Sequence, residues 1–446
     1  MNGKKKLFPA PSPPPTALCP QRWPGCNPES LATMRHVLID NHTRYHIFWN
    51  DIRFHNHVAH RALAIYALGG SGPVIEALYK QDSKFQRAAF VSPHPVTTQN
   101  FVDHLGDENY YEAYTTFFAK AIEEKGASAT LDEFIFSEKY NFQPGRDAES
   151  QPEMLCRFVN GVFHSLIHCG YGVEFGLKGM LAEGKSHVGA KEEETYIRDG
   201  IGAVMNSFAS LMLDSAMPLK APSGQDTHAF SILARVLKDP SLASKGQLNF
   251  ASQYPDTLVA HGDTIREHVQ KWTVDLSKPG EIERKIGECI WTSSVMYALG
   301  GMHLVNSSLF LPSLVAYLSP RAQVLLLRAY LSSVIAWFVV IGRPSLNFKS
   351  FFESTSTVPN PPNSPAVPPN AQTPNPFLPL IQRAFAHFST IYGARPKGYF
   401  AGTELDGAEE LDGSLFVRAA VLTADYMGWV REGEEASMWS LKGLHP

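Results

Sequence analysis

The sequence has few cysteines, and they do not follow a spacing that would organise them. The five are Cys19, Cys26, Cys156, Cys169 and Cys289, and no two form a Cys-x-x-Cys pair. An odd number without paired spacing disfavours both a disulfide framework and a cysteine zinc site. It is typical of a protein in a reducing compartment, so we expect a cytoplasmic location.

An excess of charge of either sign is also missing. The formal net charge is −4 and the pI is near 6.5, which leaves no electrostatic reason to expect a nucleic-acid partner. The first residues, MNGKKKLFPAPSPPPT, have no apolar stretch after the lysines, unlike a secretory signal. The longest apolar run, residues 325–342, contains Arg328. A membrane span is the alternative there, but we predict a buried core helix and no membrane association.

Alternating strand patterns and nucleotide-binding motifs are absent as well. No Gly-x-Gly-x-x-Gly follows a strand, and neither a P-loop nor a Gly-x-Ser-x-Gly occurs, so a Rossmann unit for NAD(P) or flavin is unsupported. Helical periodicity instead runs through most long segments. We predict an all-α fold: a Pro-rich tail (1–34), then one large helical domain (35–446). Proline blocks helix and interior strand in 354–376, which predicts a long surface loop inserted in that domain.

Several segments carry the helical pattern together with start or stop signals such as Pro and Gly. The expected helices cover residues 53–68, 73–88, 109–126, 152–170, 196–213, 281–301, 320–340 and 415–435.

Histidines form the main candidate site. His164 and His168 stand four residues apart in FHSLIHCGYG. On a continuous helix over 152–170 they would share a narrow stripe with Arg157 and Gly161, opposite an apolar face. The pattern favours the lining of an internal pocket. The i, i+4 spacing also suits two ligands of one metal ion, and two structural histidines are the third interpretation.

Further histidines strengthen the pocket interpretation. FHNHVAHR contains His55, and its His57 and His60 would share one helical face. His303 follows Tyr297 in YALGGMHLVNSS. Several glycine-flanked, apolar segments that each carry histidine are expected where helices converge on one His-lined cavity.

At these residues the chain resembles the questin oxidase-like family of fungal secondary metabolism. The similarity is carried by NHVAHRALAIYALGG (56–70), HSLIHCGYGVEFG (164–176) and YALGGMHLVNSS (297–308), and extends more loosely over 35–440. The resemblance implies a Baeyer–Villiger-type oxidoreductase that opens a ring of an anthraquinone polyketide. It implies that a separate NADPH-dependent reductase first reduces the quinone to a hydroquinone. Some members act without flavin or metal, whereas one type holds a non-haem iron through histidines and a carboxylated lysine.

The resemblance also assigns residues. His57 or His60, His164, His168 and His303 match the family's pocket histidines. Iron-binding members carry a C-terminal His-x-x-Lys-x-x-Arg-Ala helix. This chain has Asp412 and Leu415 at the His and Lys positions of DGSLFVRAA. The loss of the lysine puts an iron in doubt, so no cofactor is firmly implied and the metal stays an open question.

Three functions remain open. The first is a cofactor-independent oxygenase, in which the reduced substrate activates O₂ and histidines of near-neutral pKa act as base and oxyanion donors. The second is a non-haem iron oxygenase using the same histidines, and the third a non-enzymatic helical binding protein. A flat substrate would need aromatic walls and a cation beside its phenolate. The candidates for these substrate contacts are Tyr66, Arg157, Phe163, Tyr171, Trp291 and Tyr297.

Overall fold

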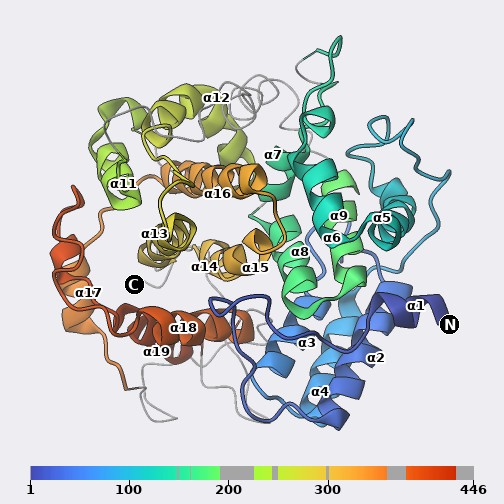
Figure 1. Cartoon of the computed structure of the whole chain (residues 1–446). Coiled ribbons are helices and arrows are strands. Elements are labelled where there is room, and N and C mark those ends of the chain that lie inside the picture. The colour runs from blue at the N-terminus through green and yellow to red at the C-terminus, as the bar shows by residue number, and fades with distance from the viewer. Residues whose placement is uncertain are drawn as a thin grey trace.

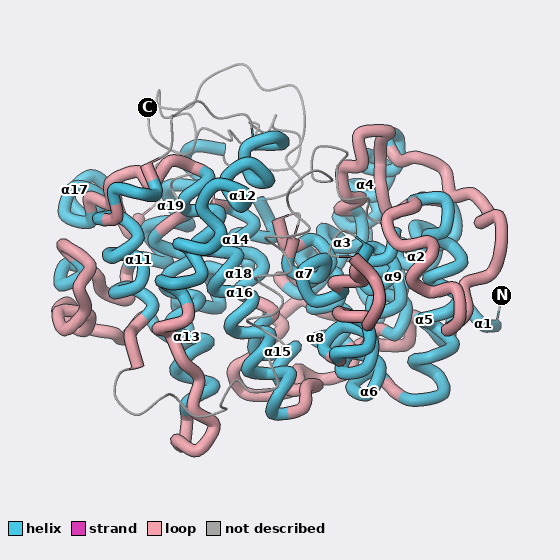
Figure 2. The backbone as a smooth tube through the Cα atoms, turned by 90° about the horizontal axis from the view of Figure 1, so that it is seen from above, coloured by secondary structure: helices cyan, strands magenta, loops and turns pink. Residues whose placement is uncertain are grey.

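The structure is a computed structural model that describes residues 2–147, 150–160, 162–190, 226–243, 250–297, 301–358 and 378–427. Within these ranges the regular elements are helices, and the pairing between extended segments is limited to two isolated bridges, Tyr45 with Ala88 and Phe48 with His55. Figure 2 shows helices joined by loops throughout the described chain. The predicted all-α fold is therefore confirmed. The expected helix 196–213 and most of the expected loop 354–376 lie outside the described residues.

The N-terminal helices gather on one side of the molecule (Figure 1). They pack mainly through α8 against α9, α5 against α9, and α2 against α3 and α4. Their bounds are α1 Asn2–Leu7, α2 Pro28–Arg44, α3 Val58–Ala67, α4 Gly72–Asp82, α5 Tyr111–Lys125, α6 Ala127–Leu131, α7 Met154–Val159, α8 His164–Phe175 and α9 Lys178–Ala190.

The C-terminal helices form the other side. There α16 packs on α12 and α13, and α18 lies along α19. Their bounds are α11 Ala229–Lys238, α12 Phe250–Val269, α13 Glu281–Val295, α14 Met302–Ser308, α15 Leu311–Val315, α16 Pro320–Val340, α17 Phe348–Ser354, α18 Leu378–Tyr392 and α19 Leu415–Met427. Helices α14 and α15 contact α8, and α18 contacts α3, so α3 and α8 lie where the two sides meet.

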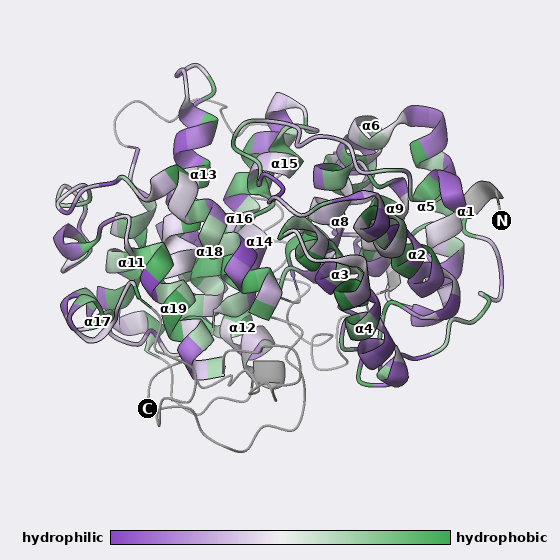
Figure 3. Cartoon of the chain, turned by 90° about the horizontal axis from the view of Figure 1, so that it is seen from below, coloured by the Kyte–Doolittle hydropathy of each residue, from purple (hydrophilic) through white to green (hydrophobic). Residues whose placement is uncertain are grey.

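Helix α16 is the longest apolar element of the described chain. It has the length and composition of a membrane span, but 83% of its most apolar window is buried inside the protein. It begins at Pro320 and ends at Val340, the bounds expected from the sequence. Figure 3 shows contrasting surface segments, in which one end of α4 and the outer end of α13 are hydrophilic. Helix α16 is therefore a core helix of the protein.

The Pro-rich N-terminal segment lies against the folded chain. The ring of Phe8 is buried, the Ser12 amide donates to the Phe175 carbonyl (2.9 Å), and the Trp23 amide donates to the Ala67 carbonyl (2.8 Å). Helix α2 starts at Pro28, inside the segment expected as tail, with Asn27 and Ser30 forming a reciprocal cap. The segment before α2 is thus anchored to α3 and α8 by backbone hydrogen bonds.

The expectation of one helix over 152–170 is wrong. Helix α7 ends at Val159 and α8 begins at His164, and between them Val162 and Phe163 have left-handed backbones (φ 53° and 66°). Two successive non-glycine residues in this region interrupt a right-handed helix. Gly170 does not end α8, which continues to Phe175 and stops at Gly176 (φ 68°). The stripe of Arg157 and Gly161 with the two histidines therefore does not exist as one helical face.

Candidate active site

Six histidines crowd together where the two sides of the molecule meet. Their ring nitrogens form two sets of three, and within each set the ligand atoms lie within 4.8 Å of one another. The inner histidine group is fully buried, whereas the outer histidine group is partly exposed. The inner group consists of His55, His60 and His168, and the outer group of His57, His164 and His303.

The inner group is held by short contacts between imidazole nitrogens. The Nε2 atom of His60 lies 3.0 Å from Nδ1 of His168, and Nε2 of His55 lies 3.4 Å from the same Nδ1 atom. The Nδ1 atoms of His55 and His60 are buried and have no hydrogen-bond partner within the described chain. Three nitrogens thus converge on one point in a region from which water is largely excluded.

The outer group lies directly beside the inner one. Nε2 of His164 is 3.2 Å from Nε2 of His57, and the rings of His164 and His303 are 4.7 Å apart in an edge-to-face arrangement. The ring of His164 also stacks on that of His55 at 4.8 Å and joins the two groups. Because its members are partly exposed, the outer group is the part of the cluster that a bound molecule could reach.

Different local structures present these side chains. His55 sits in the isolated bridge with Phe48, His57 is the N-cap residue of α3, and only His60 lies within that helix. The expectation that His57 and His60 share a helical face is therefore wrong, and they belong to different groups. His164 is the first residue of α8 and is placed by the left-handed Val162 and Phe163. Backbone strain of this kind concentrates at functional sites.

The two histidines with i, i+4 spacing also belong to different groups. His164 belongs to the outer group and His168 to the inner group, so the two do not converge on a single point as ligands of one ion. His303, on α14, is the histidine that the C-terminal helices contribute to the two groups. The predicted convergence of several histidine-bearing segments is confirmed, although the pairing within it differs from the helical pattern.

Burial lowers the pKa of four imidazoles of the cluster and so favours their neutral form. It lowers the pKa of His303 to about 4. Together with repulsion from nearby histidines, it lowers the pKa of His57 to about 3. Burial, with repulsion from neighbouring imidazoles, also holds the pKa values of His55 and His60 well below the usual value. The expectation of near-neutral pKa values is wrong for these four. Neutral imidazoles donate or accept hydrogen bonds and bind metal ions through a lone pair.

A buried carboxylate supports the inner group. Glu183, on α9, accepts from Nε2 of His168 (2.9 Å) and contacts Nδ1 of His42 (2.5 Å). Burial opposes ionisation of Glu183, but attraction to His42 and hydrogen bonds from His168 and His42 outweigh it and lower the carboxyl pKa to about 2. The cluster therefore includes one fixed negative charge beside six imidazoles.

The donor set of each group fits a transition-metal ion. Imidazole nitrogens suit iron, zinc and copper, and three converging lone pairs repel one another unless a proton, a water molecule or a cation lies between them. The unpartnered Nδ1 atoms of His55 and His60 are consistent with Nε2 acting as the ligand atom. Leu415, the first residue of α19, stands where the family resemblance implies a lysine. Leucine cannot form the carboxylated lysine that would be an anionic ligand at this position.

One expected substrate contact meets the cluster. The Tyr171 ring stacks on His60 at 5.2 Å. The other aromatic candidates have ring contacts elsewhere: Phe163 with Tyr330, Trp291 with Phe400 and Phe416, and Tyr297 with Phe385. Tyr66 is buried in α3, and the Arg157 side chain donates to the Pro152 carbonyl (2.9 Å).

Sequence reasoning missed three neighbours of the cluster. Glu183 and His187 lie on α9, a helix that was not expected, and His42 lies on α2. His187 contacts the Ser165 hydroxyl (2.6 Å), and its ring is 4.9 Å from that of His55. Glu183 and His187 are separated by four residues, and this spacing in AEGKSHVGA was the available signal.

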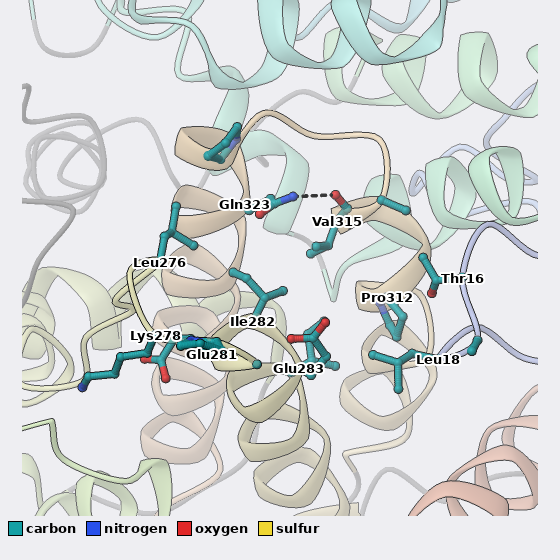
Figure 4. A pocket seen from close by; sticks show the side chains of 16 residues that line it. Thr16, Leu18, Leu276, Lys278, Glu281, Ile282, Glu283, Pro312, Val315 and Gln323 are labelled. Atoms are coloured by element: carbon teal, nitrogen blue, oxygen red, sulfur yellow. Dashed lines mark hydrogen bonds between the residues drawn. The ribbon is translucent and has the colours of Figure 1, made fainter.

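A separate open groove of about 740 Å³ lies near the N-terminal segment (Figure 4). Its walls come from that segment, the start of α13, α15 and the start of α16, and include Leu18, Ile282, Pro312 and Gln323. Its lining contains none of the six histidines. The groove is therefore distinct from the candidate active site.

The histidine cluster is supported by a carboxylate and is partly exposed on one side. This construction is that of an enzyme site rather than of a structural histidine cluster. Comparison with known families agrees. Residues 54–390 match the questin oxidase-like family, and the chain belongs to that family. It is therefore an oxidoreductase.

Named relatives of this chain come from fungi. A Baeyer–Villiger oxidase of Paecilomyces divaricatus is 24% identical over 355 residues, covering 74% of this chain and 72% of the relative. A questin oxidase of Aspergillus terreus is 23% identical over 361 residues, 74% of each chain. A Baeyer–Villiger monooxygenase of Aspergillus aculeatus is 31% identical over 255 residues, 56% of this chain and 44% of the relative. The likeness to the first two relatives thus covers most of the chain.

Proposed function

We propose that this protein performs a Baeyer–Villiger-type oxidative ring opening of a reduced anthraquinone, with O₂ as co-substrate. The observation that carries the proposal is the partly exposed outer histidine group, next to a fully buried inner group, in a chain of the questin oxidase-like family. The relatives named Baeyer–Villiger oxidase and questin oxidase support the reaction class. A cytoplasmic location and an upstream NADPH-dependent quinone reductase are parts of the same proposal.

In the proposed reaction the substrate itself activates oxygen. Loss of a phenolic proton makes the hydroquinone electron-rich, and its electron pair forms the new C–O bond to O₂. The hydroperoxide then breaks its O–O bond as a ring C–C bond migrates to the inner oxygen, and the outer oxygen leaves as water. Hydrolysis of the ring-expanded lactone opens the ring. Neutral imidazoles of the outer group accept the phenolic proton and donate hydrogen bonds to the developing oxyanion. The Tyr171 ring is fully buried and stacks on His60 of the inner group, so it supports that group from behind.

Burial suits this chemistry in two ways. It keeps water from competing for the peroxide, and it strengthens every hydrogen bond made to a developing charge. The low pKa values of His57 and His303 make these imidazoles weak bases, so a proton that one of them takes up is passed on at once. The same histidine then donates a hydrogen bond later in the reaction.

A second candidate uses the same residues with a metal ion. The convergence of three nitrogens within 4.8 Å in each group favours it. The inner or the outer histidine group would hold the ion, which would supply Lewis-acid and redox chemistry toward O₂. The chain's own residues would in either case bind the hydroquinone, exclude water and move its protons.

The test uses anaerobic purified protein. A chemically reduced anthraquinone is added, and ¹⁸O₂ is then admitted. We expect oxygen consumption and a ring-opened product that carries ¹⁸O. Absence of both, with folded protein and several reduced anthraquinones, would contradict the oxygenase proposal and favour a binding protein. Elemental analysis of the same sample separates the two enzymatic routes, because stoichiometric iron that tracks activity would rule out the metal-free one.

A further inference from the structure

Glu183 lies between the histidine cluster and the edge of the protein. One carboxylate oxygen, Oε2, contacts Nε2 of His168 at 2.9 Å, and the other, Oε1, contacts Nδ1 of His42 at 2.5 Å. The Glu183 side chain is 4% exposed and that of His42 is 12% exposed. The carboxylate is thus buried between one histidine inside the cluster and one that reaches the surface.

The positions of the protons follow from these contacts. An ionised carboxylate only accepts hydrogen bonds, so both nitrogens that contact it must carry hydrogen. His168 therefore has its proton on Nε2, and His42 has a proton on Nδ1. In neutral His168 the remaining Nδ1 atom is then a lone pair. It faces Nε2 of His60 at 3.0 Å and Nε2 of His55 at 3.4 Å.

The packing of two helices holds Glu183 in this place. A Cβ atom added at Gly184 would lie 2.8 Å from the backbone nitrogen of Cys169, and one at Gly172 would lie 2.8 Å from that of Leu181. Glycines on both α8 and α9 therefore let the two backbones approach closely. This approach brings the carboxylate, on α9, within hydrogen-bond distance of His168, on α8.

We propose that Glu183 is the positioning residue of the inner histidine group, and that its carboxylate fixes His168 as the Nε2–H tautomer with the Nδ1 lone pair directed at His55 and His60. His42 is the second donor to this carboxylate and holds it from the opposite side. A hydrogen-bonded carboxylate behind a histidine sets which ring nitrogen faces the reacting atoms, whether these belong to a substrate or to a metal ion. The effect on turnover rests on the proposed function, but the placement of protons does not.

The experiment locates the protons directly in the full-length protein labelled with ¹⁵N-histidine and stripped of metal by a chelator. We expect His168 to be protonated on Nε2 and His42 on Nδ1, with both N–H signals shifted downfield and slow to exchange. His168→Gln and His42→Gln assign the two signals. In Glu183→Ala both downfield signals are lost. A wild-type His168 with its proton on Nδ1, or unchanged signals in Glu183→Ala, would overturn the inference.

Glu183→Gln gives a second readout that does not depend on the fold of the alanine variant. The amide oxygen still accepts from His168, but the amide nitrogen cannot accept from Nδ1–H of His42. We expect the His168 signal to persist and the His42 signal to disappear. Loss of the His168 signal while the His42 signal persists would contradict the proposed arrangement.

Glu288→Gln is the matched control. Glu288 is also a buried carboxylate that accepts several N–H groups, from Ala229, Trp272 and Arg284. Replacing Glu288 should leave the N–H signals of His168 and His42 unchanged. Loss of these signals in Glu288→Gln would show that they respond to any buried substitution, and it would overturn the inference. With a substrate that the wild-type protein converts, the kcat of Glu183→Ala should be at least about tenfold lower than that of the wild type, with little change in KM. A failed turnover assay contradicts the proposed function alone, because the histidine signals are read without substrate.

Discussion

At the scale of single residues, four of the clustered imidazoles have lowered pKa values. Charged imidazoles at ring separations of 4.7 to 4.8 Å would repel one another strongly, and burial adds to that cost. Burial therefore favours the uncharged form, with its free lone pair, at His55, His57, His60 and His303. Within the part of the chain that the structure describes, Glu183 is the carboxylate with a lowered pKa that contacts the cluster directly. Such a centre is suited to passing protons between a bound phenol and the protein, or to holding a cation.

The outer group should carry most of the reaction. We expect His164→Ala and His303→Ala each to lower ring-opening turnover at least about 100-fold, because each removes an imidazole that the substrate can reach. Steady-state kinetics with a reduced anthraquinone measures this, and circular dichroism checks that helicity is unchanged. His94→Ala removes an exposed histidine in a loop and should retain full activity. Full activity in both outer variants would exclude the outer group from the site.

At the scale of elements, the sequence predicted some long helices, such as α5 and α16, and missed others, including α2, α12 and α18. The bounds of α16 follow from Pro320 and the apolar run, and α5 ends at Gly126 as expected. The break before α8 was missed because Val162 and Phe163 do not favour left-handed backbones, and only tertiary packing keeps them there. Helix α9 was missed because three glycines interrupt its apolar pattern in KGMLAEGKSHVGA.

Gly184 allows α9 to pack closely against α8, and a substitution at this residue tests that role. Gly184→Ala should destabilise the protein by about 1–3 kcal/mol, because the new methyl group would overlap Cys169 on α8. It should also reduce turnover, since α9 carries Glu183. Urea unfolding measures the first effect and kinetics the second.

Gly287→Ala is the matched control, in the interior of α13. The nearest atom to its new Cβ would be the Tyr392 hydroxyl at 3.4 Å, an ordinary contact. Alanine has the higher helix propensity, so this variant should be neutral or more stable by up to about 1 kcal/mol. Equal behaviour of the two variants would contradict the close approach of α8 and α9.

At the scale of the whole molecule, a buried histidine (His46) and a half-buried one (His387), both outside the cluster, make stability depend on pH. Burial lowers the pKa of His46 to about 4 and that of His387 to about 4, from an unfolded value near 6.5. Between these values the unfolded chain binds more protons than the folded one. The stabilising contribution is therefore present above pH 6.5 and is lost as the pH falls toward 4.

We expect the free energy of unfolding to decrease on acidification through this window, with each such histidine adding a slope of up to about 1.4 kcal/mol per pH unit. His387→Gln should make the dependence shallower by about one proton, whereas the exposed His94→Gln should not. Urea titrations at several pH values between 6.5 and 4.5 measure the slopes. Identical slopes for wild type and His387→Gln would contradict the neutral state of His387.

What the sequence determined by itself was the helical class and the set of histidine-bearing segments, because helical periodicity and glycine or proline signals act over a few residues. It also carried the family likeness, which rests on the same segments. The division of the histidines into an inner and an outer group, and the support of His168 by Glu183, were decided by the tertiary structure. These contacts join α3, α8, α9 and α14 across long stretches of chain, and the close packing that creates them has no signature within one segment.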